Sequence, residues 1–208
     1  MKKIIGVFIA VFALVACTVK LSAILNVSDI LSDANKALMV DVRVYVMSCD
    51  EDSIAEIQTA FEKRKIAAHF NKCGSTDGFN DYANFSLPIA IVHDLSKPIP
   101  VENGIYFYVA DDTLSLRTSD SFASMLVSDS VFDERIEISS IEFSLTNDGM
   151  TDFVIRPGLA FVNESPVFNT EITIPSFSKV LIKLPDVANK LLEKSNAEYP
   201  VFTFVRND

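Results

Sequence analysis

Histidine is the side chain best suited to act as a catalytic base, and this chain has only two, His69 and His93. His93 is followed by Asp94, but neighbouring residues on a strand point to opposite faces, so the two do not form a base with its orienting acid. The sequence has no GxSxG nucleophile motif, no Walker loop and no GxGxxG. We therefore expect no catalytic residues.

Carboxylates offer a second kind of chemistry. Six acids are concentrated in one part of the chain: Asp111, Asp112, Asp120, Asp129, Asp133 and Glu134. Calcium needs several oxygen ligands, but these acids lack the spaced DxDxDG pattern, so a solvated acidic loop is the preferred interpretation. A glycosidase carboxylate pair stays open, although the absence of tryptophan platforms disfavours it.

The first seventeen residues have the organisation of an exported protein. Two lysines precede an apolar run over residues 4–14, and Leu14-Val15-Ala16-Cys17 closes the segment. A basic start, an apolar core of about 7–15 residues and small residues before a cleavage point are typical of a secretory signal peptide. The cysteine directly after Ala16 makes this end resemble the lipobox of bacterial lipoproteins.

The resemblance implies a fixed order of processing. The Cys17 thiol would receive a diacylglycerol, a peptidase would cleave between Ala16 and Cys17, and the new amino group would be acylated. Covalent lipid is then the only cofactor-like group expected. The apolar run is too short for a transmembrane helix of about 20 residues. In lipoproteins of this kind, an Asp directly after the lipidated cysteine favours retention in the inner membrane. This chain has Thr18 at that position, so the resemblance implies the outer membrane of a Gram-negative bacterium.

The protein left after cleavage is strongly acidic. Removing residues 1–16 takes away two lysines and no acid, so the formal charge changes from −10 to −12. A surface of this sign repels nucleic-acid phosphates and anionic lipid headgroups. We therefore expect no nucleic-acid partner, and we expect a lipid and a tether to hold the domain at the membrane.

Two further cysteines, Cys49 and Cys73, have a structural role in this interpretation. An even number of cysteines in an exported chain predicts a disulfide. Its loop of about 25 residues would stabilise the fold by roughly 3.5 kcal/mol in the chain-entropy model. A metal or nucleophile site has little support, because the spacing is not CxxC and only His69 lies near, whereas zinc prefers four ligands.

Local patterns predict strands with a few short helices. Valines alternate with polar residues over Met39–Met47, which predicts a strand, and Ser53 with Glu56 forms a capping box for a helix to about Lys65. The alternation shifts by one residue at Ser139-Ser140, as a β-bulge would require. Four further elements are expected. A helix should run from Ser28 to about Ala37, and a loop should contain Cys73, Gly74 and Gly78. Arg135–Leu145 and Asp152–Val162 should form a hairpin around Asn147-Asp148-Gly149, and a helix should follow Asp186 with Val187, Leu191 and Leu192 inward.

These elements predict an α+β fold, mostly antiparallel β-sheet with two or three short helices. Residues 1–16 form the signal peptide and residues 17–208 a single sheet-rich domain, with two lobes split near residues 95–103 as the alternative. The sixteen phenylalanines predict a large aromatic core.

The sequence favours a non-enzymatic binding module at the outer membrane that contacts another envelope protein. Its signal, its size and the Ser-Asp-Ile-Leu stretch at residues 28–31 resemble small uncharacterised lipoproteins of Gram-negative bacteria and their prophages, which implies a phage-related role. The alternatives are an envelope hydrolase, which needs a histidine or acid pair in a concave site, and a lipid or lipoprotein carrier, which needs a continuous apolar cavity.

Overall fold

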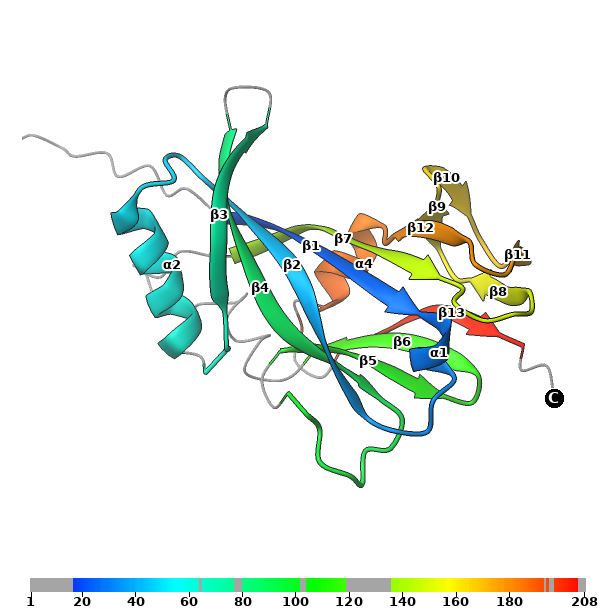
Figure 1. The fold of residues 1–208 in the computed structure, drawn as a ribbon. Coiled ribbons are helices and arrows are strands. Elements are labelled where there is room, and N and C mark those ends of the chain that lie inside the picture. Colours follow the sequence, from blue (N-terminus) through cyan, green and yellow to red (C-terminus); the bar gives the residue numbers. More distant parts are fainter. Residues whose placement is uncertain are drawn as a thin grey trace, which may run out of the picture.

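The computed structural model describes residues 17–63, 65–76, 80–101, 104–118, 136–192, 194 and 197–205. Within them, thirteen strands form one curled sheet, and the chain has an α+β fold (Figure 1). The strands are β1 (Cys17–Asn26), β2 (Lys36–Val46), β3 (His69–Thr76), β4 (Asn80–Val92), β5 (Ile105–Ala110), β6 (Thr113–Thr118), β7 (Ile136–Thr146), β8 (Phe153–Pro157), β9 (Ala160–Val162), β10 (Ser165–Val167), β11 (Ile172–Ile174), β12 (Lys179–Lys183) and β13 (Glu198–Phe204). The helices are α1 (Val27–Ile30), α2 (Glu51–Lys63) and α4 (Asp186–Leu192).

The predicted fold class is confirmed, and most strand pairs are antiparallel. The sheet is nevertheless mixed, because β1 runs parallel to β7 and β4 runs parallel to β5. The strand order is β10-β9-β12-β7-β1-β2-β4-β5-β6-β13-β8-β11, and β3 pairs with β4 outside this path.

Strand β4 is the point where the sheet forks. It pairs with β2 over its length, while its other side pairs with β3 up to Ser86 and with β5 from Ala90 onward. Pro88 falls between these two partners in the register of the described strands. Because proline has no N–H to donate, this gap suits it.

Burial alternates along the strands and defines an inner and an outer face of the sheet. In β2, Val40 and Val42 are buried, whereas Met39 is exposed. The inner side chains meet because the sheet curls over itself. The Phe107 ring of β5 lies 5.6 Å from that of Phe143 in β7, although β4, β2 and β1 separate these strands in the sheet order.

Helix α2 packs on the inner face beside β3 and β4 (Figure 1). The Phe61 ring lies 5.4 Å from that of Phe85, in an edge-to-face arrangement. The helix begins two residues earlier than its predicted cap, Ser53. Its first turn is capped by Asp50, whose carboxylate accepts a hydrogen bond from the Ser53 N–H at 2.9 Å.

A disulfide joins Cys49, just before α2, to Cys73, with the two Cα atoms 5.9 Å apart. The loop predicted around Cys73 and Gly74 is wrong, because His69–Thr76 forms β3 and pairs with β4. Most side chains of β3 are exposed at the edge of the sheet. The strand therefore carries little of the hydrophobic alternation that would reveal it in the sequence.

The bulge predicted at Ser139-Ser140 is confirmed. Val19 of β1 pairs with Ile138 and Lys20 pairs with Ser140, which leaves Ser139 as the extra residue. The Ser139 hydroxyl donates a hydrogen bond of 3.0 Å to the Val19 carbonyl. The bulge therefore lies in the central parallel pair of the sheet.

The hairpin predicted between β7 and the following strand is wrong. The neighbours of β7 are β1 and β12, whereas β8 pairs with β11 and β13. The turn at Asn147 does form. The buried side-chain amide of Asn147 donates hydrogen bonds to the carbonyl oxygens of Thr151 and Ile174, each at a distance of 2.9 Å. These bonds hold the chain after β7 against β11 and leave the edge of β7 to β12.

Two predicted helices need correction. Helix α1 ends at Ile30 and β2 already begins at Lys36, so the helix predicted up to Ala37 is a single turn. In α4, Leu192 is buried as expected, but Val187 is 58% exposed and Ala188 is buried instead. Residues one turn apart lie over one another, so Ala188 and Leu192 form the inward side of the helix.

Among the described helices, none is long and apolar enough to cross a bilayer.

Candidate functional site

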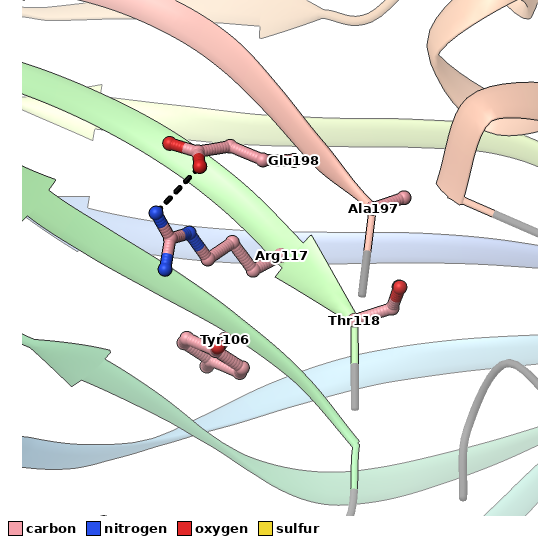
Figure 2. Close-up of a pocket in the computed structure, with 5 residues that line it drawn as sticks. All are labelled: Tyr106, Arg117, Thr118, Ala197 and Glu198. Carbon is pink, nitrogen blue, oxygen red and sulfur yellow. Dashed lines mark hydrogen bonds and ion pairs between the residues drawn. The ribbon is translucent and has the colours of Figure 1, made fainter. Parts of the chain in front are cut away.

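A polar pocket of about 250 Å³ opens on the outer face where β5, β6 and β13 run side by side. Figure 2 shows the side chains that line it, which are Tyr106, Arg117, Thr118, Ala197 and Glu198.

The pocket is assembled by cross-strand pairing. Arg117 of β6 lies opposite Tyr106 of β5 on one side and opposite Glu198 of β13 on the other. Side chains directly opposite each other on antiparallel strands share a face and interact. Arg117 and Glu198 are 81 residues apart in the chain. No sequence motif joins them, so neither residue can be identified from the sequence as part of a site.

Arg117 is the chemically distinctive group of the pocket. Its Nη2 atom lies 2.5 Å from a Glu198 carboxylate oxygen, and its guanidinium carbon lies 4.0 Å from the centre of the Tyr108 ring. The Nε atom is buried and has no hydrogen-bond partner among the described residues. Because a guanidinium has five N–H donors in a planar fork, Glu198 uses only part of its capacity. The arrangement can therefore hold a carboxylate or phosphate group.

His93 and Asp94 lie outside this pocket, and the structure records a separate contact for each. His93 directly follows the end of β4, and its Nε2 atom lies 3.1 Å from the Asp29 carbonyl oxygen. The Asp94 carboxylate accepts hydrogen bonds from the side chain and backbone of Ser96, which hold the pKa of Asp94 below its ordinary value. His69 is exposed at the start of β3.

The acidic cluster is only partly described. Asp111 and Asp112 form the tight turn between β5 and β6, with φ angles of +48° and +56°. The other four acids, from Asp120 to Glu134, lie outside the described residues. Within the part of the chain that is described, no three His, Cys, Asp or Glu side chains are grouped as metal ligands would be.

Cys17 is the first residue of β1, and its backbone is already in register with Ile136 of β7. Two residues later, Val19 is buried in the core. Residues 1–16, including Ala16 of the predicted cleavage site, lie outside the described residues.

An apolar cavity between the two curled halves of the sheet, lined by Leu21, Val40, Phe107 and Phe143 among other described residues, has a volume of about 30 Å³. This cavity is too small to hold an acyl chain. Not all phenylalanines pack inward as expected, since Phe168 and Phe177 are more than 70% exposed, at 72% and 73%.

The fold and pocket define an α+β protein with a single curled sheet and a polar, arginine-bearing recess on its outer face. Comparison with known families matches residues 19–207 to the domain of unknown function DUF7424, and the chain belongs to this family. No curated protein and no solved structure matches the chain.

Proposed function

We propose that this protein is a lipid-anchored cell-envelope protein whose folded domain is a non-catalytic binding module. The observation that carries the proposal is the segment Leu14-Val15-Ala16-Cys17, which resembles a lipobox and follows a basic start and an apolar run. Cys17 itself belongs to β1. Cleavage before Cys17 would remove the apolar leader and leave every described strand intact. The absence of Asp after Cys17 supports the outer membrane as the destination.

The binding role is supported by the Arg117 pocket. Arg117 is held in place by Glu198 and Tyr108, yet it keeps donors that neither group uses. A rigid cation with spare donors can bind an acceptor group of a partner without any covalent chemistry. A hydrolase is less well supported, because His93 is engaged with the backbone of Asp29 and lies outside the pocket.

The anchor is tested by metabolic labelling with palmitate. The wild-type protein should incorporate label, and Cys17→Ser should lose the label and accumulate as the uncleaved precursor. Cys73→Ser is the matched control, because it also replaces a cysteine by serine but leaves the lipobox intact. Normal maturation of Cys17→Ser would refute the proposal.

The binding role is tested by photo-crosslinking in intact cells, with a photoreactive amino acid at Tyr106. A specific adduct should form in the wild-type background and disappear with Arg117→Ala. Arg156→Ala is the control, because Arg156 also pairs with a glutamate, Glu171 at 3.0 Å, but lies on β8 outside the pocket. An adduct that survives Arg117→Ala would contradict a role for this pocket.

A further inference from the structure

The outer face of β3, β4, β2, β1 and β7 carries a row of cations. The strand register places Lys72, Asn84, Arg43, Lys20 and Ser140 side by side across these five strands. Lys20 forms an ion pair of 2.7 Å with Glu142, which lies on the same face. Neither Arg43 nor Lys72 has a carboxylate within 4 Å among the described residues, and Arg43 instead lies 5.1 Å from the centre of the Tyr82 ring.

Positive charge predominates on this face as a whole. At positions whose side chains are described, this face has five cations and two carboxylates. The cations are Lys20, Arg43, Lys72, Lys179 and Lys183, and the carboxylates are Asp41 and Glu142. The whole chain, in contrast, has a formal charge of −10.

Exposed apolar side chains lie beside the cations on the same face. Ile24 of β1 is 67% exposed, Met39 of β2 62% and Leu181 of β12 39%. Ile24 and Leu181 both pair with Ser144 of β7, so they belong to one row across the sheet. Tyr45 and Tyr82 lie beyond the cationic row, toward Cys17, with ring centroids 6.1 Å apart. Lysine, arginine and tyrosine with exposed aliphatic residues are the composition of a surface that lies at a membrane interface.

The acidic side chains of helix α2 are on the other side of the sheet. The helix packs through Phe61 against Phe85, and Phe85 points inward whereas its neighbour Asn84 stands in the cationic row. The exposed acids of α2 are Glu51, Asp52, Glu56 and Glu62. Negative charge is thus separated from the cationic face by the thickness of the sheet.

We propose that this outer face lies on the phospholipid surface that holds the Cys17 anchor, with lipid phosphates contacting Lys20, Arg43 and Lys72. The proposal rests on the proposed function, because it needs the lipid on Cys17. Cys17 itself belongs to β1, so no described residue stands between the predicted anchor and the sheet. Lys20 is three residues from the anchor, about 10 Å along an extended strand. The cations are therefore held at headgroup level, where each contributes about fivefold to surface affinity.

The test uses the lipidated full chain, matured in bacteria and reconstituted in vesicles of phosphatidylethanolamine and phosphatidylglycerol. A photoreactive p-benzoylphenylalanine replaces Ile24 on the outer face or, as the matched control, exposed Ala55 on α2. Mass spectrometry reads two quantities from one sample, namely the lipid on Cys17 and the phospholipid adduct at the probe. We expect lipid on Cys17 and adducts at position 24 but not at position 55.

A charge-reversal pair makes the test specific. Lys72→Glu with Lys183→Glu should lower the adduct yield at position 24 by at least about fivefold for each lysine, because each change removes a cation and adds an anion. Lys63→Glu with Lys190→Glu changes the total charge equally but lies on α2 and α4, and it should leave the yield unchanged.

The outcomes separate the two proposals. A protein without lipid on Cys17 overturns the proposed function and the docking with it. A lipidated protein that forms equal adducts at positions 24 and 55 overturns only the docking. Adducts from position 24 to a protein rather than to phospholipid in intact cells would likewise overturn it, and would assign this face to a protein partner.

Discussion

Tyr82 of β4 lies directly over Gly74 of β3, so that a Cβ placed on Gly74 would come within 2.3 Å of the Tyr82 ring. The same ring contacts Tyr45 edge-on and lies beneath the Arg43 guanidinium. The missing side chain at position 74 therefore makes room for the aromatic and cationic cluster near the start of β1.

Gly74→Ala should displace the Tyr82 ring. The variant would lose the contacts of Tyr82 with Tyr45 and Arg43, each worth about 0.5–1.5 kcal/mol, and we expect the free energy of unfolding to fall by about 1–2 kcal/mol. Urea denaturation measures the change. In a Tyr82→Ala background Gly74→Ala should have little effect, and Ser75→Ala is a control on the same strand. An equal loss in both backgrounds would contradict the proposed overlap.

The Cys49–Cys73 disulfide should carry a large share of the stability. It joins residues 24 apart in sequence, and a cross-link of this span constrains the unfolded chain by roughly 3.5 kcal/mol. Replacing both cysteines by alanine should lower the free energy of unfolding by about this amount. Thiol titration of the denatured, non-reduced mature protein should find no free thiol. Two reactive thiols would show that the bridge does not form.

Acid should weaken the contact between Ser28 and Asp148, which connects α1 to the turn after β7. Burial acts to raise the pKa of Asp148, but hydrogen bonds from the Ser28 hydroxyl and N–H together hold this pKa below its ordinary value. A carboxyl with a lowered folded-state pKa stabilises the fold above its unfolded pKa, near 4, and this contribution is lost as the pH falls through the folded value.

Asp148→Asn should therefore flatten the decrease of unfolding free energy below about pH 4. Ser28→Ala should flatten it less, because the backbone N–H of residue 28 still donates to the carboxylate, and the double variant should resemble Asp148→Asn. Urea denaturation at a series of pH values measures the slope. An unchanged slope in Asp148→Asn would mean that this carboxyl does not govern acid stability.

Arg117→Lys should show whether the planar guanidinium matters to the pocket. Lysine keeps the positive charge but loses the stacking on Tyr108 and the forked donors, so we expect a loss of about 1 kcal/mol in unfolding free energy. Arg156→Lys at the exposed Glu171 pair should change it by less than about 0.5 kcal/mol. Equal effects at both positions would show that the Tyr108 contact adds nothing.

Local signals in the sequence predicted much of the secondary structure correctly. The valine alternation in β2, the helix after Cys49 and the Ser139 bulge were each encoded in a few adjacent residues. Such features depend on the side-chain period and on capping, which act over short distances. The predicted elements together gave an α+β fold in which strands predominate.

The tertiary structure decided which strands meet. The turn at Asn147 was visible in the sequence, but only the competition between β8 and β12 for the edge of β7 determined the pairing. For the same reason the Arg117–Glu198 pair, which depends on β6 meeting β13, could not be read from spacing.

The charge of the domain shows the same division. The sequence by itself determined a net charge of −10 and a lipobox-like Cys17. Only the sheet register decided that Lys20, Arg43 and Lys72 share one face while the acids of α2 lie on the other. Net charge is a sum over the chain, whereas a neighbouring surface interacts with the charges of the face turned toward it, and that face exists only after distant strands have paired.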